Sequence, residues 1–360
     1  MNKLRVLIVD DSVVIRRVLR EVVSSDPELE VAGVAANGAI ALSMIEQVNP
    51  DLVTLDVEMP VMDGLEALAA IRAVRPSLPV IMFSTLTVRG AAETIEALTR
   101  GATDYVTKPS ECGNLPAAIQ QIRSQLIPKI KALRFRQTSE TQSCGLVSQI
   151  AQRRTASRVA VEAVVIGTST GGPNALAAVI PHVPAKFPVP ILIVQHMPPL
   201  FTRFLADRLA DCSNIRVAEA CGGEVLEPGC AWMAPGNYHL TVVRETGRVR
   251  LMIKQDAPEN SCRPSVDVLF RSAAEIYGPG LLALVMTGMG QDGLIGCQRV
   301  KQNGGRVLVQ DEATSVVWGM PGFVAKAGLA DKILPLQQIG SEIVRVTNLH
   351  RAVASIGMTF

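Results

Sequence analysis

Acidic and basic side chains follow short apolar segments in the first third of the sequence. Asp10 and Asp11 end the first such segment, and Asp56 ends the third. Lys108 ends the fifth. Because parallel strands bring their carboxyl ends to one edge of a sheet, these groups are expected to meet there. Three carboxylates repel one another unless a divalent cation joins them, and oxygen ligands favour Mg²⁺. A nearby lysine would balance an incoming phosphoryl group. Any one acid alone could equally cap the next helix, but the ordered set is hard to obtain by chance.

A serine lies on a predicted strand-to-helix turn later in the chain. The segment Gly167-Thr168-Ser169-Thr170-Gly171 matches the G-x-S-x-G pattern of hydrolase nucleophiles. At such a turn, backbone N–H groups and the helix dipole favour developing negative charge. Glycine-rich turns also bind phosphate groups. The motif by itself therefore leaves a nucleophilic serine and an anion site both open.

A nucleophilic serine needs a base, and the chain has four histidines. His182 follows the helix after Ser169, which places it at the opposite edge of the sheet. His239 begins a predicted hairpin, and His350 lies in a predicted terminal helix. His196 directly follows an apolar segment, on the same edge as Ser169. Elimination therefore favours His196 as the base.

A carboxylate should orient the base and stabilise the imidazolium. Asp292 and Asp311 both follow predicted strands, so strand position alone does not separate them. The glycines within 288–290 indicate a loop held close to another group, which favours Asp292. Asp292 could also cap a helix predicted over 293–303.

Composition excludes several classes of protein. The chain has 360 residues, of which 48% are hydrophobic and 19% charged, enough apolar mass for two folded domains. A net charge of +2 gives no electrostatic support for nucleic-acid binding. Seven cysteines without a C-x-x-C pair are not typical of a disulfide framework or a structural zinc site. With no signal peptide and no apolar stretch near ~20 residues, we expect a cytoplasmic protein without membrane insertion.

Charge distribution indicates the domain boundaries. Residues 126–160 contain seven basic residues and one acidic residue, whereas the charges on either side are more nearly balanced. This composition predicts a tether, and a docking site for an acidic partner is the second interpretation. We predict a first domain over 1–123, a basic linker over 124–158 and a second domain over 159–352.

Apolar segments alternate with helical patterns in both domains. The first helical pattern begins after Ser12, a predicted N-cap. The segment 239–253 alternates apolar and polar residues around Thr246-Gly247, which predicts an antiparallel hairpin. We therefore predict an α/β protein with two doubly wound parallel-sheet domains, the second carrying a β-hairpin. The segments read as strands are 5–10, 51–56, 79–84, 102–108, 163–167, 191–195, 281–288 and 306–311.

The acidic set and its lysine, followed by Pro109, resemble the receiver domain of two-component response regulators over residues 1 to about 123. The resemblance implies that Asp56 accepts phosphate from a histidine kinase. It implies that Asp10 and Asp11 help bind Mg²⁺ and that Lys108 contacts the phosphate.

The same resemblance implies a switch pair. Ser84 ends the fourth predicted strand and Tyr105 lies in the fifth. Receivers carry Thr or Ser at the first of these positions. Thr85 directly follows, but the alignment to the strand favours Ser84.

The chain order of serine, histidine and aspartate differs from the Ser-Asp-His order of α/β-hydrolases. The whole chain instead resembles chemotaxis response-regulator protein-glutamate methylesterases. The resemblance implies that Ser169 is the nucleophile, His196 the base and Asp292 the orienting acid. It also implies that the Met289 backbone helps form the oxyanion hole and that Thr170 lies near the triad. The resemblance further implies that the esterase reaction requires no cofactor. The motifs that carry it are IGTSTGGP, QHMPPLFT, APGNYHL, CRPSVDVLF and GMGQDG.

The resemblance predicts a phosphorylation-activated esterase. Its substrates would be glutamyl γ-methyl esters, and selected glutamines, on the cytoplasmic domains of methyl-accepting chemoreceptors. A chemotaxis histidine kinase would be the phosphodonor. The alternative is a phosphorylation-controlled module that binds an anion or a receptor without catalysis. Binding of an anion alone would not require His196 and Asp292 on the same edge as Ser169.

Overall fold

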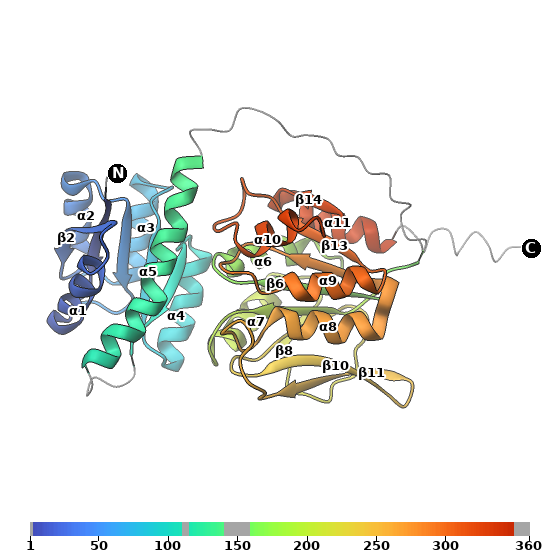
Figure 1. Cartoon of the computed structure of the whole chain (residues 1–360). Helices are drawn as coiled ribbons and strands as arrows, with labels where there is room; N and C mark the ends of the chain where they lie inside the picture. The colour runs from blue at the N-terminus through green and yellow to red at the C-terminus, as the bar shows by residue number, and fades with distance from the viewer. Residues whose placement is uncertain (1–2, 110–114, 140–158, 349–360) are drawn as a thin grey trace, which may run out of the picture. The chain divides into compact units, whose positions relative to one another are not determined.

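The computed structural model describes residues 3–109, 115–139 and 159–348. The chain divides into two units, residues 1–142 and 143–360 (Figure 1). No helix in these described ranges is both long enough and apolar enough to cross a bilayer.

The first unit is built on a five-stranded parallel sheet with the order β2-β1-β3-β4-β5. Both β2 and β3 pair with β1, on opposite sides of it. The strand order therefore reverses at β1. In open parallel sheets a crevice forms beside such a reversal, outside the carboxyl ends of the strands. The predicted N-cap is confirmed, because Ser12 Oγ accepts a hydrogen bond from the N–H of Ile15. The elements are β1 (Leu4–Val9), α1 (Val13–Ser24), β2 (Leu29–Ala35), α2 (Gly38–Val48), β3 (Leu52–Asp56), α3 (Gly64–Val74), β4 (Val80–Ser84), α4 (Val88–Thr99), β5 (Asp104–Thr107) and α5 (Leu115–Ser139).

Helix α5 extends past residue 123, where we expected the first domain to end. Leu126, Ile130 and Leu133 are buried and lie on one face of the helix. This apolar face explains why the helix continues into the segment expected to be a linker. The rest of that segment, residues 140–158, lies outside the described residues.

Two lysines of α5 have acidic partners within the first unit. Lys129 Nζ lies 2.7 Å from Asp104 Oδ2, and Lys131 Nζ lies 2.9 Å from Asp26 Oδ2. Part of the basic charge at 126–160 therefore belongs to a packed helix rather than to a tether.

The second unit contains a seven-stranded parallel sheet with the order β14-β13-β12-β6-β7-β9-β8. The chain begins at β6, runs outward through β7 to the β8 edge, and returns to β12 on the other side of β6. The reversal therefore lies beside β6, and the carboxyl ends of β12, β6 and β7 border it. The elements are β6 (Ala163–Thr168), α6 (Gly172–Val179), η1 (Ile180–His182), β7 (Ile191–Gln195), α7 (Phe201–Asp211), β8 (Arg216–Glu219), β9 (Cys230–Met233), β10 (His239–Glu245), β11 (Arg248–Lys254), α8 (Val266–Tyr277), η2 (Gly278–Gly280), β12 (Leu281–Val285), α9 (Leu294–Gln302), β13 (Arg306–Gln310), α10 (Met320–Lys326), β14 (Lys332–Leu334) and α11 (Leu336–Asn348).

The predicted hairpin is formed by β10 and β11, which pair antiparallel. Thr246 and Gly247 both have positive φ, as tight hairpin turns with the twist of the strands require. Leu240 and Leu251 of the hairpin share one buried cluster with Phe270 of α8 and with residues of the parallel sheet. Two parallel α/β sheets and one hairpin confirm the predicted fold class.

Candidate functional site

The first unit gathers the predicted acidic residues at the carboxyl edge of its sheet. Asp10 follows β1 and Asp56 ends β3, and both are buried. Lys108 follows β5, and its Nζ lies 2.7 Å from Asp56 Oδ2 and 3.1 Å from Asp10 Oδ2. Asp11, which is exposed, completes a group whose carboxylate oxygens lie within 4.8 Å of one another. Asp11, Asp56 and Lys108 line a pocket of about 500 Å³.

Burial and neighbouring charges shift the pKa values of the acids and the lysine at this edge. Burial, and then the charge of Asp10, raises the pKa of Asp56 to about 7. Burial also raises the pKa of Asp10, although Lys108 opposes the shift. Burial lowers the pKa of Lys108, but the charges of Asp10 and Asp56 outweigh it and raise that pKa. The donor set consists of carboxylate oxygens only, and it fits a hard divalent cation such as Mg²⁺.

The predicted switch residues lie near this pocket. Ser84 ends β4 with its side chain buried, and its hydroxyl donates to the carbonyl of Gly90 at 3.0 Å. Thr85 is partly exposed. Tyr105 is buried in β5, and its ring centroid lies 5.0 Å from Lys129 Nζ. Of the two hydroxyls, Ser84 therefore provides the buried one.

In the second unit, Ser169 lies between β6 and α6 on a turn that requires glycine. Gly171 has a φ of 76°, a conformation that L side chains rarely adopt. A Cβ at Gly172 would lie 1.9 Å from Gln195 Oε1. The amide of that glutamine is fixed, because Thr168 Oγ1 donates to its oxygen and its Nε2 donates to the Ser169 carbonyl. Gln195, the last residue of β7, thus ties the Ser169 turn to the neighbouring strand.

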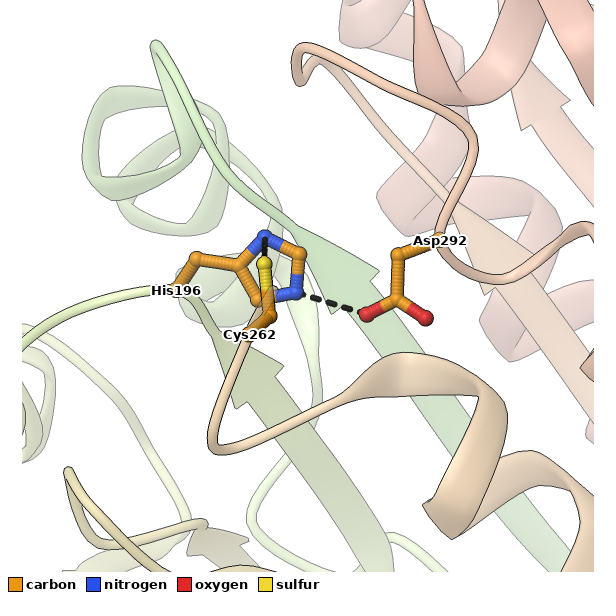
Figure 2. Close-up of side chains that lie close together, drawn as sticks. All are labelled: His196, Cys262 and Asp292. Atoms are coloured by element: carbon orange, nitrogen blue, oxygen red, sulfur yellow. Dashed lines mark hydrogen bonds and ion pairs between the residues drawn. The ribbon is translucent and has the colours of Figure 1, made fainter. Parts of the chain in front are cut away.

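His196 directly follows β7, which pairs with β6 so that Thr168 is opposite Gln195. Ser169 and His196 therefore leave neighbouring strands at the same level. His196 Nε2 lies 2.8 Å from Oδ2 of Asp292, which belongs to the loop that follows β12 (Figure 2). Within the described ranges, no hydrogen bond joins the Ser169 hydroxyl to the imidazole. Catalytic hydrogen bonds are often long without substrate and shorten when it binds.

The Asp292 carboxylate, 2% exposed, is held at the N-terminus of α8. The positive end of a helix dipole stabilises a negative charge there. Convergent donors leave little freedom for the carboxylate to rotate. Oδ2 accepts from the N–H of Val266 at 2.7 Å, and Oδ1 accepts from Ser265 Oγ at 2.9 Å, Asn260 Nδ2 at 2.9 Å and the N–H of Asp267 at 3.1 Å.

The histidine and the carboxylate favour each other's charged form. Burial raises the pKa of Asp292, but the hydrogen bond and charge of His196, with two backbone N–H groups, lower it well below its usual range. Burial lowers the pKa of His196, but contacts with Asp292 and Cys262 outweigh it and raise that pKa. An ionised carboxylate beside the ring stabilises the imidazolium that forms when the base takes a proton.

The other acidic candidate has a local role. Asp311 follows β13, and its Oδ1 accepts hydrogen bonds from the N–H and the hydroxyl of Thr314. His239 has both ring nitrogens bonded, Nδ1 to the N–H of Ser265 and Nε2 to the carbonyl of Ala257. His182 ends the short helix η1. His350 lies outside the described residues.

The loop after β12 lies directly against the serine turn. A Cβ at Gly288 would lie 2.8 Å from Ser169 Cβ, so only glycine allows this approach. Met289 is 37% exposed, whereas Thr170 is buried. In the part of the chain that the structure describes, the N–H groups of Met289 and Thr170 have no acceptor. Both N–H groups are therefore free to donate to another acceptor.

Three residues of this site were missed by the sequence reasoning. Asn260 and Ser265 hold Asp292, and Cys262 Sγ lies 3.6 Å from His196 Nδ1 (Figure 2). A serine before the helical pattern after Pro264 is an N-cap signal that could have identified Ser265. No spacing rule links Asn260 or Cys262 to a histidine more than sixty residues away.

Two protein families match the chain. CheB methylesterase matches residues 164–343, and the response regulator receiver domain matches residues 6–120. These ranges include Ser169, His196 and Asp292 in the former, and Asp56 and Lys108 in the latter.

Relatives match over nearly the full length. A protein-glutamate methylesterase/protein-glutamine glutaminase of Trichodesmium erythraeum (strain IMS101) is 54% identical, covering 96% of this chain and 99% of its own. One of Thermotoga maritima is 41% identical, covering 95% and 98%. The crystal structure of the Thermotoga maritima CheB methylesterase catalytic domain is 44% identical with a TM-score of 0.51, covering 52% of this chain and 99% of that one. The chain therefore belongs to the protein-glutamate methylesterase/protein-glutamine glutaminase family, enzymes that here join a receiver domain to a CheB methylesterase domain.

Proposed function

We propose that the chain is a phosphorylation-activated hydrolase of the cytoplasm. It would cleave glutamyl γ-methyl esters on the cytoplasmic helices of chemoreceptors and deamidate selected receptor glutamines. Family membership supports the reaction class, since relatives over nearly the full length carry both activities in their names. Ser169, His196 and Asp292 would form the catalytic triad.

The observation that carries this proposal is the 2.8 Å contact between His196 Nε2 and Asp292 Oδ2 at the same sheet edge as Ser169. A buried carboxylate on one ring nitrogen fixes the tautomer and leaves the lone pair on Nδ1. An anion-binding turn would need only glycines and N–H groups. The pair therefore favours catalysis over non-catalytic binding.

Acylation would begin when Ser169 Oγ attacks the ester carbonyl carbon. His196 Nδ1 takes the hydroxyl proton, while Asp292 stabilises the imidazolium. The N–H groups of Met289 and Thr170 would bind the oxygen that becomes negative. The carbon–oxygen bond to the methoxy group then breaks, and the imidazolium proton passes to departing methanol.

Deacylation would repeat these steps with water. His196 Nδ1 takes a proton from water, whose oxygen attacks the acyl carbon, and the proton then returns to Ser169 Oγ. The products are glutamate and the free serine. A glutamine side chain enters the same sequence, with ammonia as the leaving group instead of methanol.

A fluorophosphonate probe tests whether the serine is chemically activated. We expect covalent labelling of the full-length protein at Ser169, located by peptide mass spectrometry. A Ser169→Ala variant should not be labelled. Absence of labelling in the unsubstituted chain would favour the non-catalytic binding module.

The receiver domain would control access to the catalytic edge. We infer that Asp56 accepts a phosphoryl group from a chemotaxis histidine kinase and that Lys108 contacts it. Mg²⁺ held by Asp10, Asp11 and Asp56 would neutralise phosphoryl charge. Ser84 would exchange its bond to a backbone carbonyl for one to the phosphate, and Tyr105 would move with it. The changed receiver surface would then release the second unit.

Phosphorylation is therefore expected to raise hydrolytic activity. A small phosphodonor with Mg²⁺ should activate the full-length protein, and removal of Mg²⁺ should abolish that activation. Asp56→Ala should not respond, because the acceptor is absent. Initial rates of methanol release, measured with and without the phosphodonor, give the activities of the phosphorylated and unphosphorylated protein.

The direction of control has its own test. Because the receiver is part of the same chain, its local concentration near the second unit is high, so a modest interface would be enough for inhibition. A fragment starting near residue 155 should therefore be more active than the unphosphorylated full-length protein. If it is no more active, occlusion is wrong, and the receiver must act positively, for example by recruitment to the receptor.

A further inference from the structure

Cys262 has no part in the proposed hydrolysis, yet its Sγ lies 3.6 Å from His196 Nδ1. The carboxylate of Asp292 lies on the other side of the ring, at Nε2 (Figure 2). We propose that Cys262 and His196 together bind Zn²⁺ and that the bound ion inhibits the hydrolase. This inference rests on the proposed role of His196 as the base.

The separation of the two ligand atoms suits a tetrahedral ion. Zinc binds cysteine sulfur at about 2.3 Å and histidine nitrogen at about 2.0–2.1 Å. Two such bonds at the tetrahedral angle place sulfur and nitrogen roughly 3.6 Å apart. The observed distance of 3.6 Å between Cys262 Sγ and His196 Nδ1 matches this separation. Without metal, the same distance suits a thiol hydrogen bond to the imidazole, so zinc would replace one proton.

The surroundings of the histidine are those of a metal ligand. Histidines that bind metals usually donate their other ring N–H to a carboxylate, which fixes the tautomer and the ring orientation. Asp292 does this for His196 at 2.8 Å. The donors at the α8 N-terminus in turn fix Asp292, so the lone pair on Nδ1 points in a fixed direction.

The ligand types select the metal. A thiolate and an imidazole favour zinc over magnesium, whereas the carboxylates of Asp10, Asp11 and Asp56 favour magnesium. The two units would therefore respond to different divalent cations. With two protein ligands, water would complete the coordination, as suits a reversible inhibitory site rather than a structural one.

Inhibition follows from the lone pair that the ion occupies. His196 Nδ1 must accept the proton of Ser169, and a zinc ion bound there prevents this transfer. On binding, the S–H bond of Cys262 breaks, a zinc–sulfur bond forms, and the proton goes to solvent. No redox step is involved.

Binding and inhibition can be measured separately on the full-length protein. Cobalt(II) in place of zinc should give a thiolate-to-cobalt charge-transfer band in the near ultraviolet. Zinc should inhibit methanol release at constant Mg²⁺. Cys262→Ser should lose the band and raise the zinc concentration for half-inhibition at least ~10-fold, since even outer-shell partners are worth 10–100-fold in metal affinity. Cys212→Ser, at an exposed cysteine, should behave like the unsubstituted protein.

Each rate is compared with the zinc-free rate of the same variant. Equal zinc sensitivity of the Cys262→Ser variant and the unsubstituted protein, or an unchanged cobalt band, would overturn the proposal. Equal sensitivity would also be the result if zinc inhibited by binding the receiver acids, because the Cys262→Ser substitution leaves those acids intact. If the protein hydrolysed no ester at all, the proposed function would fail, and the cobalt spectra would still decide whether the metal site exists.

Discussion

Replacing Ser169 by alanine is expected to reduce methanol release from methylated receptor membranes by ~10⁴–10⁶-fold. The hydroxyl would form the covalent bond to the acyl group, so its removal eliminates the acyl-enzyme route. His196 and Asp292 keep their contact in this variant, because neither depends on the serine side chain. The residual rate would come from the oxyanion donors and from substrate binding alone.

The fold of the variant must be intact for this result to concern catalysis. The serine turn is held by backbone and glutamine contacts, since Gln195 binds the Ser169 carbonyl rather than its hydroxyl. We therefore expect an unchanged circular dichroism spectrum and melting temperature. Ser341→Ala, at an exposed serine of α11, is the matched control and should keep its full rate. A Ser169→Ala variant with more than a tenth of the activity would exclude Ser169 as the nucleophile.

The fold was largely predictable because buried parallel strands are continuous apolar segments. The segments ending at Asp56 and preceding Ser169 became central strands. The strands that were not identified include β8 and β14, edge strands of four and three residues. Such short strands leave little apolar pattern. The continuation of α5 past residue 123 was not predicted, because the basic composition of that segment is typical of a linker and hides the buried apolar face of the helix.

The site was predictable as far as strand ends determine it. Ser169 and His196 follow adjacent strands, so the sheet edge alone brings them to one level. Asp292 and Asp311 could not be separated in this way, because both follow strands at that edge. The distinction comes from α8, whose N-terminal N–H groups converge on Asp292. Contacts between a loop and a helix start more than twenty residues apart are set by tertiary packing, which sequence periodicity does not describe.

Replacing Asp292 by asparagine should lower turnover by roughly 10³–10⁴-fold. Oδ1 of Asp292 accepts from four groups, so the asparagine oxygen should take that position. The four donors are Asn260, Ser265 and the N–H groups of Asp267 and Gly293. Its NH₂ group would then face His196 Nε2 and donate to it. The ring proton would move to Nδ1, where the lone pair for the serine is needed.

Asp311→Asn is the matched control for this experiment. Asp311 also follows a strand of the same sheet, but its carboxylate bonds Thr314 within its own turn. Its substitution should change the rate less than ~10-fold, because it neither contacts His196 nor alters the ring tautomer. Initial rates of methanol release for the two variants, with fluorophosphonate labelling of Ser169 as a second readout, compare them directly. If Asp311→Asn were the slower enzyme, the acid that orients His196 during turnover would not be Asp292, despite the contact between them.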